Sequence, residues 1–198
     1  MVCDLLGRIA EGLRQAGIPY MVIGGQAVLL YGEPRLTRDI DIILGRPPSS
    51  LPCILDVVGK LRLKPLVTPE TFVPETWVLP CLDPESGLKV DFVFSDSEYE
   101  RQAIKRAKEV AIGSFIVAFA SLEDVIIHKV IAGRARDLED VRQLLLKNPT
   151  ADLRYIRKWL RALATVTDEP LAERFEDLLT QVKLARRKKT DRKGHRSQ

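Results

Sequence analysis

The pattern of hydrophobic and polar positions changes near residue 120. Before that point, short apolar runs alternate with amphipathic stretches, which predicts strands and helices mixed in one α/β unit. Beyond it, apolar residues recur every three or four positions, which predicts helices with breaks near Gly133, at Asn148-Pro149 and at 168–170. Strands are expected over 20–23, 39–44, 77–82, 88–94 and 115–119. The expected architecture is a small mixed sheet with helices, followed by a C-terminal helical extension.

Helices are expected over 4–15, 26–31, 51–61 and 98–108 in the first part of the chain. The segment 68–76 is rich in proline and threonine and is expected to be a loop. Residues 186–198 are basic and carry no apolar period, so this tail is expected to be disordered. We therefore divide the chain into an α/β core over 1–120, a helical region over 121–185 and a tail over 186–198.

Charge and composition narrow the classes of function. The net charge is +4, but residues 183–198 hold eight Lys or Arg and one acid, which leaves the rest slightly acidic. No apolar run reaches the ~18 residues of a membrane span, and the N-terminus lacks the features of a secretory signal. Three scattered cysteines and two histidines disfavour a disulfide framework, a zinc site and a Ser–His–Asp triad. A soluble, cytoplasmic protein is expected, in which oxygen atoms would hold any metal ion.

Acidic side chains mark one face of the predicted strand 39–44. Because side chains alternate across a strand, Asp39 and Asp41 share one face while Ile40 and Ile42 point to the core. Two carboxylates about 6–7 Å apart repel each other unless a cation lies between them, and Mg²⁺ suits that position. A solvated sheet face would also accommodate the pair.

A third acid stands alone in the predicted strand 88–94. Its bulky residues at 88, 90, 92 and 94 take the core face, which leaves Asp91 on the opposite face. If this strand lies beside 39–44, the carboxylates of Asp39, Asp41 and Asp91 converge. Such a cluster is typical of two-metal sites that bind a triphosphate and activate a hydroxyl. On an exposed edge strand, Asp91 would be an ordinary surface acid.

Two further features suit phosphate binding. Gly24-Gly25 follows the strand 20–23, and glycines at such a turn let backbone N–H groups approach phosphate oxygens, although a plain turn has the same composition. Lys129 lies on the apolar face of its predicted helix, where a lysine either extends to the core edge or pairs with an anionic group. His128 lies off that face and is expected at the surface or at its rim.

These residues carry a family resemblance. Together, Gly24, Gly25, Gly32, Arg35, Thr37, Asp39, Asp41 and Asp91 resemble the signature of the polymerase-beta-type nucleotidyltransferase superfamily. The segment GGQAVLLYGEPRLTRDIDIIL is similar, more narrowly, to AbiEii/AbiGii-type nucleotidyltransferases, known mostly as toxins of toxin–antitoxin pairs. The segments SLEDVIIHKVIAG and RARDLEDV match later motifs of that family and bring in Lys129, Asp137 and Asp140. The matches extend from about Tyr20 to Val141.

The resemblance implies a nucleotidyltransferase fold and a metal-dependent reaction that moves NMP from an NTP to an acceptor hydroxyl. It assigns Mg²⁺ or Mn²⁺ to Asp39, Asp41 and Asp91, and catalysis to these residues and Lys129. Asp140 would orient Lys129 or reach the metal site. The residues implied in binding the NTP are Gly24, Gly25, Arg35, Thr37, Lys129 and Asp140.

The acceptor is the least determined part of this interpretation. The resemblance implies the 3′ end of a tRNA, which the basic tail would suit, and a cognate antitoxin protein as a possible partner. The basic residues of 154–161 either follow RNA phosphates or form a solvated face. Alternatives are a small antibiotic or a protein hydroxyl as acceptor, or a non-catalytic regulator with this fold.

Overall fold

The chain forms two compact units. The computed structural model describes residues 2–32, 37 and 39–194, with side chains described as far as Arg186. The first unit comprises Met1–Ala27 and Arg35–Ser121, and the second comprises Val28–Pro34 and Leu122–Gln198. The division after Ser121 coincides with the change in hydrophobic pattern.

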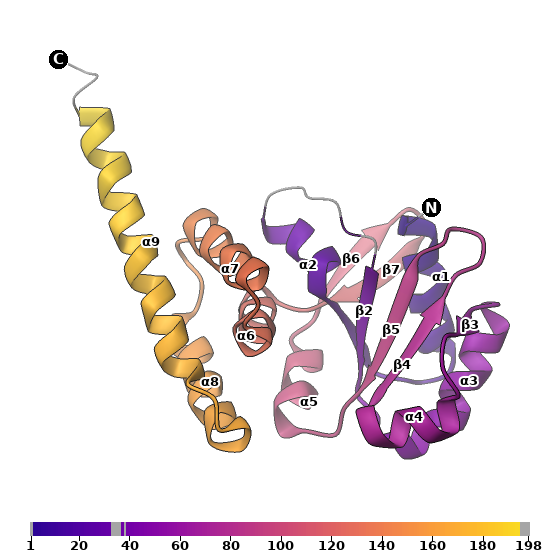
Figure 1. Ribbon diagram of the computed structural model, residues 1–198. Helices are drawn as coiled ribbons and strands as arrows, with labels where there is room; N and C mark the ends of the chain where they lie inside the picture. The colour runs from indigo at the N-terminus through magenta and orange to yellow at the C-terminus, as the bar shows by residue number, and fades with distance from the viewer. Residues whose placement is uncertain (1, 33–36, 38, 195–198) are drawn as a thin grey trace. The chain divides into compact units, whose positions relative to one another are not determined.

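A mixed sheet of seven strands forms the centre of the first unit, in the order β3-β4-β5-β2-β1-β7-β6 (Figure 1). Strand β2 pairs in parallel with β5 and antiparallel with β1, and β1 pairs in parallel with β7. The predicted mixed α/β fold is confirmed. The strands are β1 Tyr20–Ile23, β2 Asp39–Leu44, β3 Lys64–Pro65, β4 Val78–Leu82, β5 Lys89–Phe94, β6 Lys108–Ile112 and β7 Phe115–Phe119.

Helices of the first unit pack against this sheet and against each other. Helix α1 contacts β7 and α3, and the residues buried on its apolar face include Leu5, Leu6, Ile9 and Leu13. On the sheet, Ile40, Ile42 and Phe92 are fully buried, as the alternation along β2 and β5 predicts. The helices that begin in this unit are α1 Val2–Gln15, α2 Gly24–Tyr31, α3 Leu51–Lys60, α4 Pro69–Thr76 and α5 Glu98–Lys105.

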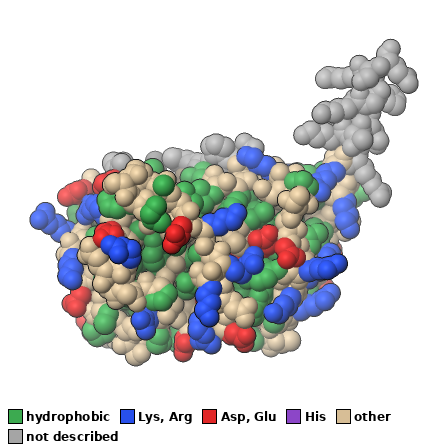
Figure 2. Space-filling model, turned by 180° about the vertical axis from the view of Figure 1, so that it is seen from behind, with side chains coloured by type: hydrophobic (Ala, Val, Ile, Leu, Met, Phe, Trp, Pro, Cys, Tyr) green, Lys and Arg blue, Asp and Glu red, His purple; other side chains and the backbone are tan. Residues whose placement is uncertain are grey.

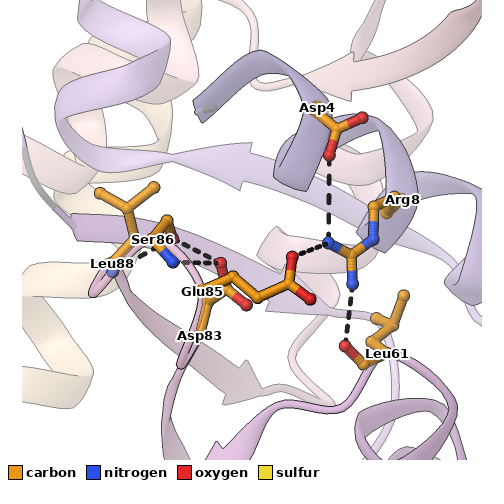
Figure 3. A network of polar contacts seen from close by, with 7 residues as sticks. All are labelled: Asp4, Arg8, Leu61, Asp83, Glu85, Ser86 and Leu88. Carbon is orange, nitrogen blue, oxygen red and sulfur yellow. Dashed lines mark hydrogen bonds and ion pairs between the residues drawn. The ribbon is translucent and has the colours of Figure 1, made fainter.

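Polar contacts brace the hairpin that carries β5 (Figure 3). In the turn between β4 and β5, the Asp83 carboxylate accepts hydrogen bonds from the backbone N–H of Ser86, at 3.2 Å, and from its hydroxyl. Arg8 on α1 donates to the backbone carbonyl of Leu61 at 3.0 Å and approaches the Glu85 carboxylate of this turn at 4.0 Å. These contacts connect the hairpin to α1 and to the end of α3.

Four helices and the C-terminal half of α2 make up the second unit. Helix α6 contacts α7, α8 and α9, and both α7 and α8 pack against α9. Helices α6, α7 and α8 end at the breaks predicted near Gly133, at Asn148-Pro149 and at 168–170. The helices are α6 Leu122–Ala132, α7 Ala135–Lys147, α8 Leu153–Thr167 and α9 Leu171–Gly194. Among the described residues, no helix has the length and apolar character needed to cross a membrane.

Two local expectations were wrong, and the strands β3 and β6 were not expected. The segment 68–76, expected to be a loop, contains helix α4, whose first residue is a proline, and proline needs no intrahelical hydrogen bond there. The helix expected over 98–108 ends at Lys105, and β6 follows it. Strand β6 buries little of its surface, so it lacks the apolar alternation that marks a strand.

The C-terminal segment also differs from expectation. Helix α9 continues to Gly194, beyond Arg186, where we expected order to end. The Arg186 guanidinium donates a hydrogen bond to the carbonyl of Leu145 on α7, which anchors this part of the helix. Lysine and arginine have high helix propensity, so a basic segment can extend a packed helix without an apolar face of its own.

Candidate active site

Strands β2 and β5 bring the predicted carboxylates to one face of the sheet. The two strands pair in parallel, with Asp41 in register with Asp91 and Asp39 in register with Lys89. Paired residues of neighbouring strands point to the same face, and the backbones lie about 4.8 Å apart. Asp39 shares that face because it lies two residues before Asp41. The pairing of β2 with β5, on which the predicted cluster depends, is therefore present.

The cluster is only partly open to solvent. Asp39 is exposed, whereas Asp41 and Asp91 are partly buried. Burial raises the pKa of the Asp91 carboxyl, and the negative charge of Asp39 raises it further, against a smaller lowering by Lys89. The ionised form of Asp91 is therefore disfavoured unless a positive charge compensates it.

Two glycines at the start of α2 lie against this cluster. A Cβ atom built on Gly24 would fall 1.9 Å from Oδ2 of Asp41, and Gly24 has a φ of +64°. A Cβ atom on Gly25 would fall 2.3 Å from the Thr37 hydroxyl oxygen. Only glycine allows the first turn of α2 to come this close to Asp41 and Thr37.

The residues present fit a magnesium ion bound together with a substrate. Among the residues that the structure describes, no three His, Cys, Asp or Glu side chains close around a point that would hold a metal ion. Mg²⁺ commonly takes one or two carboxylates and completes its coordination with water and substrate phosphates. Asp41 and Asp91, adjacent and in register, supply such a pair, and a cation there would favour the ionised form of Asp91, which burial and the charge of Asp39 disfavour.

Cys81 on the neighbouring strand β4 is not a competing ligand. Burial raises the pKa of its thiol to about 12, and the charge of Asp91 adds to this effect. The thiol therefore stays protonated at neutral pH, and a protonated thiol is a poor metal ligand and nucleophile.

Lys129, Asp137 and Asp140 form an ion cluster within the second unit. The Lys129 amine lies 2.8 Å from Oδ1 of Asp137 and 2.7 Å from Oδ2 of Asp140. The side chain of Lys129 is 6% exposed, and those of Asp137 and Asp140 are 16% and 11% exposed. The contact that was expected to orient Lys129 is thus present, while its role in phosphate binding stays a prediction.

Comparison with known proteins identifies the family. The family described as "Nucleotidyltransferase of unknown function (DUF6036)" matches residues 6–192. The chain belongs to this nucleotidyltransferase family. No curated protein matches it.

Solved structures agree with this DUF6036 assignment at the level of the fold. The antibiotic-resistance factor ANT(2″)-Ia is 14% identical, with a TM-score of 0.59 over 84% of this chain and 94% of that one. The lincosamide antibiotic adenylyltransferase LnuA is 17% identical, with a TM-score of 0.51 over 71% and 94%. An antigenic nucleotidyltransferase-like protein from Paracoccidioides brasiliensis is 17% identical, with a TM-score of 0.54 over 91% of both chains. The expected nucleotidyltransferase fold is confirmed.

The comparisons leave the narrower expectations open. They identify a DUF6036 nucleotidyltransferase, and membership of the AbiEii/AbiGii type stays a prediction. The same holds for a cognate antitoxin and an RNA acceptor.

Several site residues differ from expectation or went unnoticed. Arg35 lies outside the described residues. His128, expected at the surface or at its rim, is half-buried on α6, which packs against three other helices, and burial lowers the pKa of its imidazole to about 4. Lys89 lies in register with Asp39 and was overlooked. The alternation argument that selected Asp91 applies equally to Lys89, two residues earlier on the same strand.

Proposed function

We propose that this DUF6036 protein is a divalent-metal-dependent nucleotidyltransferase that moves NMP from an NTP to an acceptor hydroxyl and releases pyrophosphate. The observation that carries the proposal is the register of Asp41 with Asp91 on neighbouring parallel strands, with Asp39 on the same face and Gly24 against the Asp41 carboxylate.

Each of these residues has a defined part in the proposed reaction. Asp41 and Asp91 hold the metal ion, and Asp39 adds a third carboxylate at the open end of the cluster. When bound, Mg²⁺ supplies positive charge that neutralises the triphosphate and favours ionisation of the acceptor hydroxyl. The backbone N–H groups in the first turn of α2 donate hydrogen bonds to phosphate oxygens. Gly24 and Gly25 have no side chains and so leave room for the phosphates.

Proton transfer falls to Asp91 in this scheme. Its carboxylate takes the proton of the acceptor hydroxyl while the hydroxyl oxygen bonds to the α-phosphorus and the bond to pyrophosphate breaks. A role for Lys129 in binding phosphate, which the family resemblance implies, stays a proposal, and within its own unit Asp137 and Asp140 position its amine.

Label transfer tests the proposal. The protein is incubated with each α-³²P-labelled NTP and Mg²⁺, in separate reactions with total tRNA, with tobramycin or lincomycin, and alone. Asp41→Asn should lower transfer about a thousandfold or more, because it removes a charged metal ligand. Asp56→Asn is the matched control, since it neutralises an exposed aspartate on α3 and should leave transfer unchanged. An active Asp41→Asn variant would refute the metal assignment, and the absence of both transfer and NTP binding in the wild type would favour a non-catalytic regulator.

For the acceptor, we propose an RNA 3′ hydroxyl. The support is the excess of basic residues in 183–198, with eight Lys or Arg against one acid. On the face shown in Figure 2, by contrast, Lys and Arg side chains are interspersed with Asp and Glu. On α8, Arg157 is paired with Glu176 at 2.6 Å, which reduces the positive charge of the stripe over 154–161.

A small-molecule hydroxyl is the second candidate. ANT(2″)-Ia and LnuA, which share the fold, are described as an antibiotic-resistance factor and an antibiotic adenylyltransferase. A variant that lacks residues 187–198 distinguishes the RNA acceptor from the small-molecule acceptor. It removes most of the basic tail but keeps Arg186 and the hydrogen bond that Arg186 makes to α7. With an RNA acceptor, the deletion should raise the KM for RNA and flatten its salt dependence. With a small acceptor, both should stay at the wild-type values.

A further inference from the structure

A buried glutamine follows the two glycines of the proposed phosphate site, and its amide nitrogen bonds to none of the residues that the structure describes. Gln26 is the third residue of α2, directly after Gly24 and Gly25, and only 6% of its surface is exposed. Within the described part of the chain, its Nε2 has no hydrogen-bond partner. Buried amide donors are rarely left unsatisfied in native proteins, because desolvation then goes uncompensated. A partner supplied from outside the chain would remove this cost.

The position of Gln26 indicates where that partner would lie. Side chains on an α-helix lean toward its N-terminus, which favours a position of the Gln26 carboxamide near the first turn of α2. In that turn Gly24 abuts the Asp41 carboxylate, and Gly25 abuts the Thr37 hydroxyl. The backbone N–H groups of this turn also lack intrahelical acceptors.

Donors and carboxylates therefore meet at one end of α2. The amide of Gln26 and the backbone N–H groups can donate hydrogen bonds to an anionic oxygen, whereas the carboxylates of Asp41 and its neighbour Asp91 can bind a cation. A metal-bound polyphosphate satisfies both, since its oxygens face the donors while its metal ion faces the carboxylates.

We propose that Gln26 binds the triphosphate directly, by donating from Nε2 to a phosphate oxygen of the incoming NTP. This proposal rests on the proposed function and adds a residue to it. The hydrogen bond satisfies a buried donor and holds the triphosphate against the first turn of α2.

The test measures binding without chemistry, using Mg²⁺ and inorganic tripolyphosphate as the probe so that the choice of base plays no part. Three variants of the full-length chain are compared with the wild type by titration calorimetry and thermal denaturation. Gln26→Met keeps the length of the side chain but has no donor, and Gln26→Glu keeps its shape but presents a negative charge. Gln102→Met is the control, because Gln102 lies on α5 in the same unit and its amide is bonded to Glu98 at 3.2 Å.

Gln26→Met should raise the Kd for magnesium tripolyphosphate about tenfold or more, and Gln26→Glu should raise it further. The Tm of Gln26→Met should stay at or above that of the wild type, since an unsatisfied donor has been removed. Gln102→Met should bind like the wild type. If Gln26→Met and Gln26→Glu both bind with wild-type affinity, the assignment of Gln26 is wrong while the proposed function stands. If the wild type binds neither tripolyphosphate nor any NTP, both proposals are overturned.

Discussion

The contact between Gly24 and Asp41 allows a prediction in which backbone strain and steric clash are measured separately. Gly24 and Gly17 have nearly the same backbone conformation, with φ values of +64° and +65°. A Cβ atom on Gly17 meets nothing within 4 Å, whereas one on Gly24 falls 1.9 Å from Oδ2 of Asp41. Gly17→Ala therefore reports the strain of a left-handed alanine, and Gly24→Ala reports the same strain together with the clash.

The magnitudes follow from this difference. A left-handed alanine costs about 1–2 kcal/mol, part of which is offset by the reduced entropy of the unfolded chain. The free energy of unfolding should thus fall by about 1 kcal/mol in Gly17→Ala. Restoring ordinary contact at Gly24 requires the Asp41 carboxylate to move by about 1.5 Å, and overpacking of this kind adds about 1–3 kcal/mol. Gly24→Ala should therefore lose about 2–4 kcal/mol.

Activity should separate the two variants more sharply than stability does. Displacing a reacting group by about 1 Å costs on the order of a hundredfold in rate, so Gly24→Ala should lose most nucleotidyl transfer at a temperature where it is fully folded. Gly17→Ala should retain wild-type transfer. The measurements are equilibrium urea denaturation and the label-transfer assay. Equal losses of stability and equal activities in the two variants would show that Gly24 does not constrain Asp41.

Three further outcomes can be measured on the same protein. Lys129→Met should lower the free energy of unfolding by about 3–5 kcal/mol, because it leaves the carboxylates of Asp137 and Asp140 buried without the lysine cation. Adding Asp137→Asn and Asp140→Asn to this variant should restore most of the lost stability. A Lys129→Met variant as stable as the wild type would contradict this account. Asp91→Asn should stabilise the metal-free protein at neutral pH, because the folded protein, in which the pKa of Asp91 is raised, disfavours the ionised carboxylate. The gain in the free energy of unfolding should shrink as pH falls through that pKa. A gain that does not depend on pH would argue against Asp91 as its source. Burial lowers the pKa of His128 from 6.5 to about 4, so the wild type should lose up to about 3 kcal/mol of stability as pH falls across this range. A His128→Gln variant whose stability falls in the same way with pH would exclude the histidine as the cause.

The sequence predicted those parts of the site that depend on local periodicity. Alternation along β2 and β5 gave the exposed face of each strand, and with it the candidates Asp39, Asp41 and Asp91. Alternation does not specify which strands pair. The site needed β5 beside β2, although β3, α3, α4 and β4 intervene in the chain, and this contact is visible only in the folded structure.

Expectations that used a single helical face were less successful. The prediction of one buried stripe on α6 was incomplete, because α6 packs against three helices and buries residues around most of its circumference, so that His128, outside the stripe, is half-buried. Periodicity also gave no partner for Lys129. Asp137 and Asp140 lie beyond the break at Gly133, on the next helix, and only the family resemblance connected them to the lysine before the fold was known.

The hydrophobic core itself fixes the geometry of the proposed site. In the pairing of β2 with β5, Ile40 lies opposite Val90 and Ile42 opposite Phe92, and these four side chains are fully buried. A slip of one residue in either strand would turn its apolar side chains to solvent and its aspartates into the core, so the register is strongly specified. The same register sets Asp41 beside Asp91. The alignment of the two carboxylates thus follows from burial of the opposite face, and a core substitution that loosens this pairing should disturb metal binding without touching an acidic residue.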